Sequence, residues 1–131
     1  MELLQLENIV KTQLQTRVFR ELGSRYPKLS FSDEISDETA SFPNVYIHEL
    51  NPSEIGNSLE NNVIKAIRDT IQIEVSTNTS KSDARVVINS CVKAMKEIGY
   101  SASEMPIHTK LNNIYRFVIR CQRVVGEGDI F

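Results

Sequence analysis

Two hydrophobic periods follow one another in a single stretch of this sequence, 70-TIQIEVSTNTSKSDARVVINSCVKAMKEIG-99. In residues 70–77 apolar and polar side chains alternate, which predicts a half-buried strand. After Ser80 the apolar residues recur at helical spacing, and they are Ala84, Val87, Ile88, Cys91, Val92, Met95 and Ile98. Ser80 with Asp83 matches a capping box that has Asp in place of Glu or Gln, and Gly99 supplies a C-terminal stop. The stretch therefore predicts a strand, a linker and a helix.

Another helix is predicted at the start of the chain. Residues 2–22 contain neither Gly nor Pro, and the apolar residues Leu3, Leu6, Val10, Leu14, Val18 and Leu22 recur at helical spacing. Gly23 provides a C-terminal cap, and Pro27 prevents the helix from resuming. Ile9 and Phe19 point away from the apolar stripe. We expect these two side chains to need a second partner surface, either inside the domain or on a neighbouring copy.

The chain between the two helices is less regular. Residues 28–41 are polar and acidic and predict a loop, with room for one short edge strand near its start. Residues 42–50 predict a strand that has Val45 and Ile47 on one face and ends before Pro52.

Residues 53–69 carry conflicting signals, and their structure is left open. The apolar residues Leu59, Val63, Ile64 and Ile67 have helical spacing, whereas Gly56, Asn57, Asn61 and Asn62 favour a projecting loop. A long connection inside so small a domain is usually functional when it is not disordered. This segment is therefore a candidate contact arm.

Two further strands are predicted in the C-terminal part, over about residues 100–108 and 114–125, joined by a turn at 111–113. In the last strand one face carries Tyr115, Phe117, Ile119 and Cys121, and the other carries Arg116, Val118, Arg120 and Gln122. We expect the first set to face the helices.

These elements predict one α+β domain over residues 1–131, with an antiparallel or mixed sheet of about four strands and two helices packed on one face. A hydrophobic content of 40% is typical of a folded globular chain. The predicted helices leave the other sheet face uncovered, with Gln72, Glu74, Arg116, Arg120 and Gln122 on it. Such a face is either solvated or a docking surface, and the sequence favours neither.

Charge and cysteine use exclude several functions. The net charge of −2 argues against a dedicated duplex-binding domain, which normally has a clear basic excess. Cys91 and Cys121 lack the spacing of a zinc site or a redox pair, so we expect two buried thiols in a reducing compartment. No segment matches a membrane span or a secretory signal, which favours a cytoplasmic protein.

Motifs for catalysis or cofactor binding are also missing from the sequence. There is no glycine-rich phosphate loop and no GxSxG elbow, and His48 and His108 lie in separate predicted strands without nearby ligands. The acids Asp33, Glu34, Asp37 and Glu38 could pair as catalytic carboxylates, but a solvated acidic loop is the commoner reason for such a run. We expect no catalytic residues, no metal and no cofactor.

Arginines and aromatic residues alternate in the last predicted strand, which superficially resembles a platform for single-stranded nucleic acid. Stacking rings must share a face with the cations, whereas Tyr115 and Phe117 point away from Arg116 and Arg120. The alternation therefore argues against a platform. Glu74 on a neighbouring strand is instead expected to pair with either arginine.

Three stretches together resemble the tail terminator, or tail-completion, proteins of long-tailed bacteriophages. They are 42-FPNVYI-47, then 70-TIQIEV-75 running through 82-SDAR-85 into the helix, and 115-YRF-117 continuing to 125-VG-126. No single motif is diagnostic. The resemblance depends on the order of a strand, an arm, the TIQIEV strand, a polar cap, a helix and a final hairpin.

The resemblance implies a structural protein that forms a hexameric ring on the tail tube, ends its growth and offers a surface to head-completion proteins. DNA would cross the ring without specific binding, and the protein would lie in the host cytoplasm during assembly and then in the virion neck. Expected contacts with subunits or the tube are Ile9, Phe19, Leu59, Val63, Ile64, Ile67, Glu74, Arg116, Arg120, Asp129 and Phe131. The alternatives are another head-tail neck ring, or a small ferredoxin-like domain that binds nucleic acid or is an enzyme.

Overall fold

The computed structural model describes residues 6–32, 41–54, 66–102 and 104–126, and these residues form two helices and a six-stranded mixed sheet. The predicted α+β class is confirmed, with six strands instead of about four. The elements are α1 (Leu6–Leu22), β1 (Ser30–Ser32), β2 (Asn44–Glu54), β3 (Ala66–Thr77), α2 (Lys81–Glu97), β4 (Ser101–Ala102), β5 (Ile107–Leu111) and β6 (Ile114–Gly126).

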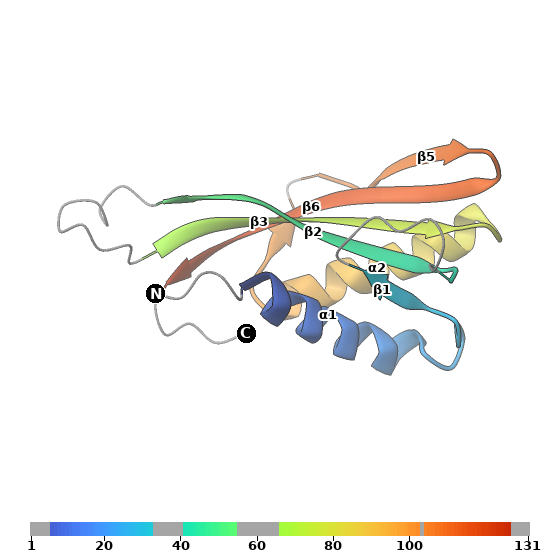
Figure 1. Ribbon diagram of the computed structural model, residues 1–131, viewed down its shortest axis with the longest axis horizontal. Helices are drawn as coiled ribbons and strands as arrows, with labels where there is room; N and C mark the ends of the chain where they lie inside the picture. Colours follow the sequence, from blue (N-terminus) through green and yellow to red (C-terminus); the bar gives the residue numbers. More distant parts are fainter. Residues whose placement is uncertain (1–5, 33–40, 55–65, 103, 127–131) are drawn as a thin grey trace.

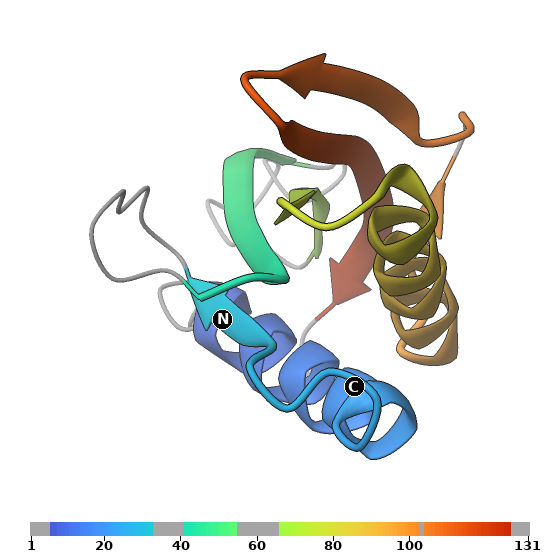
Figure 2. The ribbon, with the colours of Figure 1, turned by 90° about the vertical axis from the view of Figure 1, so that its right-hand side faces the viewer.

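The strands are ordered β1-β2-β3-β6, and both β4 and β5 pair with the outer edge of β6 (Figure 1). β1 pairs with β2 in parallel, and the other pairs are antiparallel. Both helices lie on the same face of the sheet, as predicted, and no helix of the described residues lies on the opposite face (Figures 1 and 2). We call this second face the helix-free face.

The core lies between the helices and the sheet. It contains strand residues Val45, Ile47, Ile71, Ile73, Val75, Phe117, Ile119 and Cys121, and helix residues Val10, Leu14, Val18, Ala84, Val87, Ile88, Cys91 and Met95. The strand and helix periods of the sequence predict these core positions. In a strand every second residue faces the core, and in a helix every third or fourth residue does so. Each large apolar side chain contributes about 1.5–3 kcal/mol when buried.

The second helix begins and ends where the sequence predicts. The Ser80 hydroxyl accepts a hydrogen bond from the Asp83 backbone N–H at 3.1 Å, so Ser80 is the N-cap. The Asp83 carboxylate does not complete a reciprocal capping box. It accepts hydrogen bonds from Thr79 at 2.6 Å and from Tyr26 at 2.9 Å, which ties the start of α2 to the segment after α1.

Gly99 closes α2 with a positive φ of 90°, a conformation that costs other residues about 1–2 kcal/mol. A Cβ at this position would also lie 3.1 Å from the Arg123 side chain. Gly99→Ala is therefore expected to lower the free energy of unfolding by about 1–2 kcal/mol in urea titrations. Gly99→Asn is the matched control, because Asn tolerates positive φ better and should lose less. Equal losses for the two variants would contradict the backbone explanation.

The undecided segment 53–69 is partly strand. β2 continues to Glu54 past a register shift between Leu50 and Ser53, so the prediction that it ends before Pro52 is wrong. Proline cannot donate a ladder hydrogen bond, and strands accommodate it at such irregularities. β3 begins at Ala66, and Ile67 is only 1% exposed in the core. The expected contact role of Ile67 is therefore wrong, whereas Leu59, Val63 and Ile64 lie outside the described residues.

The predicted single strand over residues 100–108 is two short strands. β4 pairs with β6 at Cys121 and Gln122, and β5 pairs with the start of β6. Pro106, which has no N–H, lies just before β5. The predicted turn is confirmed as a two-residue connection of Asn112 and Asn113, whose φ angles of 49° and 67° suit a hairpin turn.

Candidate interaction surfaces

The helix-free face carries the two arginines that the sequence placed there. Arg116 and Arg120 are exposed, but neither pairs with Glu74. Arg120 Nε donates to Gln72 Oε1 at 3.0 Å and Arg116 Nε donates to Ser76 Oγ at 3.4 Å. Each arginine contacts the residue directly opposite it on β3, whereas the partner opposite Glu74 is Val118. The expected charge ladder is therefore replaced by two cross-strand hydrogen bonds from charged guanidinium groups to neutral acceptors.

Large apolar side chains are also exposed on this face. The exposed fractions are 84% for Met105, 58% for Ile107, 73% for Leu111 and 52% for Val124. Ile107 lies opposite the half-buried Val118 in the β5–β6 pair. Met105, Ile107 and Val118 line one hollow together, and we call these three residues the apolar patch. Leu111 lies opposite Ile114 and Val124 lies opposite Arg68, at the two ends of β6.

A hollow of about 440 Å³ opens beside the apolar patch, where β6 is not covered by either β4 or β5. Its lining combines apolar and polar side chains: Gln72, Glu104, Met105, Ile107, Val118, Ile119, Arg120 and Gln122. The hollow therefore extends from the apolar patch to the cross-strand contact between Arg120 and Gln72.

The two side chains that point away from the α1 stripe have different surroundings. The Phe19 ring packs on the Phe31 ring of β1, with centroids 5.1 Å apart, so its second partner lies inside the domain. Ile9 is 42% exposed and remains a candidate contact residue. Asp129 and Phe131 lie outside the described residues.

A second charged surface lies on the helix side of the β5–β6 hairpin. His108 packs on Phe117, with ring centroids 4.9 Å apart, and stacks on Tyr115 at 6.4 Å. The Arg85 guanidinium carbon lies 5.9 Å from the Phe117 ring centre, and Lys110 Nζ lies 5.0 Å from the Tyr115 ring centre. The strand alternation correctly separated Tyr115 and Phe117 from the β6 arginines. The alternation did not predict that Arg85 of α2 and Lys110 of β5 lie against these two rings.

The pKa of His108 is lowered by burial and then by the nearby charges of Lys81, Arg85 and Lys110. A lowered pKa keeps the imidazole neutral at pH 7. Lys81 and Arg85 are four residues apart on α2, so they project from the same side of the helix. The surface is therefore charged by Lys81, Arg85 and Lys110 rather than by the histidine.

A buried polar contact lies at the other end of the sheet. The Tyr100 hydroxyl donates to Asp69 Oδ2 at 2.5 Å, and Asp69 is fully buried. Burial, followed by the hydrogen bond to Asp69, raises the pKa of Tyr100. Arg123, opposite Asp69 on β6, donates to the Ile98 carbonyl at 2.7 Å. This arrangement joins β3 and β6 to the segment after α2.

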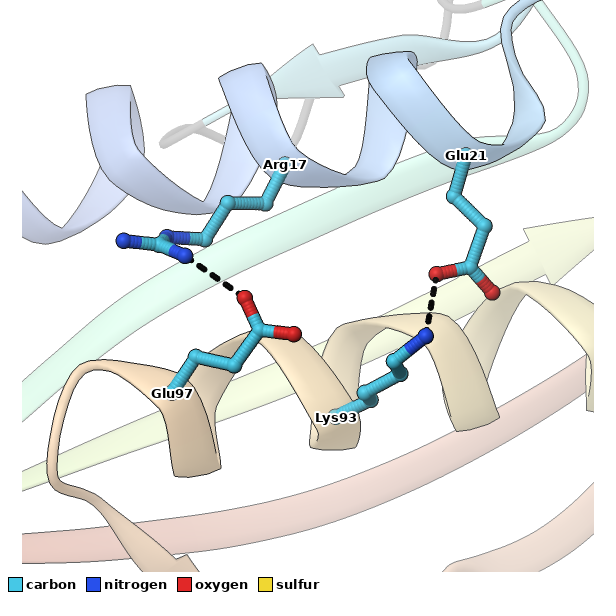
Figure 3. Close-up of polar contacts among 4 residues, drawn as sticks. All are labelled: Arg17, Glu21, Lys93 and Glu97. Atoms are coloured by element: carbon cyan, nitrogen blue, oxygen red, sulfur yellow. Dashed lines mark hydrogen bonds and ion pairs between the residues drawn. The ribbon is translucent and has the colours of Figure 1, made fainter.

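The two helices are aligned by ion pairs across their outer sides (Figure 3). Arg17 Nη1 lies 2.6 Å from Glu97 Oε2, and Lys93 Nζ lies 3.3 Å from Glu21 Oε2. All four side chains are partly or largely exposed, so each pair contributes at most about 1 kcal/mol.

The described residues also bear on metal binding, on membrane insertion and on the two cysteines. Within the described ranges, no three His, Cys, Asp or Glu side chains are grouped so that they could hold a metal ion. None of the described helices is long and apolar enough to cross a membrane. Cys91 and Cys121 are buried thiols, as predicted.

Neither models of known protein families nor curated proteins match this chain. The apolar patch and the cations of the hairpin lie on opposite faces of the β5–β6 pair. That hairpin thus presents an apolar side and a basic side, both at one edge of the sheet.

Proposed function

We propose that this chain is a structural subunit that forms a hexameric ring on the end of a phage tail tube, stops its growth and joins it to head-completion proteins. The observation that carries the proposal is the apolar patch on the helix-free face. The sequence resemblance names the kind of assembly.

The apolar patch favours contact with protein over contact with water. Burying apolar surface gains about 25 cal/mol per Å², and contiguous exposed patches on soluble domains commonly mark interaction sites. The patch includes a neighbouring pair, Ile107 and Val118, and it adjoins a hollow. A partner side chain would therefore meet both a flat apolar area and a recess.

The function would be geometric and would need no reaction. Only one face of the sheet carries the described helices, so the two sides of a subunit differ. Each subunit would dock onto one neighbour with one surface and would offer a different surface to its other neighbour. Such heterologous contacts close into a ring with two different ends, which suits a joint between a tube and a head. DNA would pass through the ring without specific binding, and a net charge of −2 suits a passage that does not retain phosphates.

Size-exclusion chromatography with light scattering tests the proposal over a range of protein concentrations. The wild-type chain is expected to form a species of six subunits, and adding it to polymerising tail tube protein should shorten the tubes. Ile107→Asp should weaken ring formation at least about tenfold, because an interface would then bury an unpaired charge. Asn89→Asp, at an exposed position on α2, adds the same charge away from the patch and should leave assembly unchanged.

A chain that stays monomeric at every concentration, and that has no effect on tube length, would contradict the proposal. If such a monomer also shifts a single-stranded nucleic-acid probe, the nucleic-acid-binding alternative replaces it. Ring formation without any effect on the tube would favour another neck component.

A further inference from the structure

A second hollow, which we call the interhelix hollow, lies between the two helices. It has a volume of about 230 Å³, and the residues that line it belong to α1 and α2. Its polar lining residues are Arg17, Arg20 and Glu21 of α1 and Ser90, Lys93 and Glu97 of α2. The volume is several times the roughly 30 Å³ that one water molecule occupies in the liquid. The hollow is therefore large enough for a small ion.

Two buried hydrogen-bond donors of this lining have no acceptor among the described residues. Ser90 is only 4% exposed, and its hydroxyl makes no hydrogen bond with a described residue. Arg17 Nε is buried and also has no acceptor, although Nη1 of the same side chain contacts Glu97. Nearly all buried donors in folded proteins have a partner, because burial takes away their hydrogen bonds to water. The two donors therefore point to a ligand that brings acceptor atoms.

The described lining also carries an excess of positive charge. Three of its side chains are basic, Arg17, Arg20 and Lys93, and two are acidic, Glu21 and Glu97. Each acid already forms an ion pair with a cation of the opposite helix (Figure 3). Arg20 is exposed and forms no ion pair with a described residue. Unpaired donors and an excess cation together are complementary to an anion.

We propose that the interhelix hollow binds a tetrahedral oxyanion, of which inorganic phosphate is the simplest form. Ser90 Oγ and Arg17 Nε donate hydrogen bonds to its oxygen atoms, and Arg20 and Lys93 balance its charge from the solvent side. A guanidinium group suits this role because its donors are planar and permanently charged. The anion contacts both helices, so its binding joins α1 to α2. This site does not depend on the proposed ring.

A water molecule in the hollow would also accept hydrogen bonds from the two donors. Water is neutral, so it gains little from the excess positive charge. Hydrogen bonds to an ionised acceptor are roughly twice as strong as those between neutral groups. The two ligands also differ in a measurable way, because only an added anion stabilises the folded state in proportion to the logarithm of its concentration.

Isothermal titration calorimetry of the full chain with sodium phosphate tests the proposal at about pH 7.5, with sodium chloride holding the ionic strength at about 0.15 M. The wild-type chain should bind phosphate in a saturable manner. Its thermal unfolding midpoint should rise as phosphate is added, since a ligand that binds only the folded state stabilises it. Sodium chloride alone at the same ionic strength should leave the midpoint unchanged.

Ser90→Ala should raise the dissociation constant for phosphate at least about tenfold, because a hydrogen bond to a charged group is lost. Arg17→Lys should have a similar effect, since lysine keeps the positive charge but has no Nε donor. The controls Ser82→Ala and Arg85→Lys make the same substitutions at exposed positions of α2 outside the hollow, and both should bind as wild type. Without phosphate, Ser90→Ala should be at least as stable as wild type, because alanine favours the helix.

A phosphomonoester identifies the source of the oxyanion. Glycerol phosphate that binds as tightly as inorganic phosphate would assign the hollow to phosphoryl groups on larger molecules, and tighter binding of the free ion would assign it to inorganic phosphate. Both results support the site.

Three results would overturn the proposal. The first is no saturable binding of phosphate up to about 50 mM. The second is an equal affinity of wild type, Ser90→Ala and Arg17→Lys for phosphate. The third is a loss of stability in Ser90→Ala without phosphate, which would show that the hydroxyl has a partner within the fold. Ring formation is measured separately by light scattering, so none of these results bears on the proposed function.

Discussion

The free energy of unfolding of this protein is expected to fall steeply as the pH rises above about 9. Burial raises the pKa of the Cys121 thiol to about 11, and it raises the pKa of Cys91 further. In the unfolded chain a cysteine titrates near pH 8.5. The folded state therefore holds its protons after the unfolded state has released them, and alkaline pH favours unfolding.

The size of this effect follows from the number of protons released. Below about pH 8.5 the thiols are protonated in both the folded and the unfolded state, so their ionisation does not lower the free energy of unfolding. Above it each thiol lowers the stability by about 1.4 kcal/mol per pH unit until its folded pKa is reached. Two thiols would together remove about 5 kcal/mol by pH 10.5, which is comparable with the whole stability of a small domain. Tyr100, whose pKa is also raised, adds to the loss above about pH 10.

Urea titrations at about pH 7.5, 9 and 10.5, with a reductant present, measure this dependence. The variant Cys91→Ala with Cys121→Ala loses stability at neutral pH because it leaves space in the core. Its stability should nevertheless change much less between the two higher pH values. A wild-type chain whose free energy of unfolding is constant up to about pH 10.5 would show that the thiols are not buried in the folded state.

Tyr100→Phe is expected to lower the free energy of unfolding by about 1–3 kcal/mol. The substitution keeps the ring but removes the hydroxyl that donates to Asp69 Oδ2. Asp69 is fully buried, and its other carboxylate oxygen accepts no hydrogen bond from the described residues. The variant would therefore leave a buried carboxylate without its donor, which is more costly than the loss of an exposed hydrogen bond.

A double-mutant cycle with Asp69→Asn isolates this contact. When Tyr100→Phe is combined with Asp69→Asn, it should cost less than in the wild type, because no charged acceptor is left behind. Tyr115→Phe is the control, since within the described chain its hydroxyl makes no hydrogen bond, and its effect should stay within about 0.5 kcal/mol. A loss below that limit for Tyr100→Phe would exclude a role for the contact in stability.

Local patterns were sufficient for the elements whose side chains repeat without interruption. The alternation around Ile73 and the helical spacing around Ile88 identified β3 and α2, and Ser80 and Gly99 marked the ends of the helix correctly. These signals depend on near neighbours in the chain, and the burial of one face follows from the period itself. The same reasoning placed Arg116 and Arg120 on the helix-free face.

Patterns failed where an element depends on a distant partner. Ile67 belongs to a segment whose signals were divided between helical turns and a projecting loop, whereas its pairing with Val125 on β6 makes it part of a strand. The division of the predicted strand into β4 and β5 likewise depends on β6, because β4 pairs with Cys121 and Gln122 and β5 pairs with residues 114–118. A short apolar segment does not specify its partner, so the period alone could not separate these cases.

The sequence by itself determined the α+β class, the two helices, the buried thiols and the alternation that separates rings from arginines on β6. Only the tertiary structure brought Lys81 and Arg85 of α2 to Lys110 of β5, and Tyr100 to Asp69. The physical reason is that periodicity reports the side of an element on which a residue lies. Which element packs against that side depends on strand pairing between segments that are far apart in the chain.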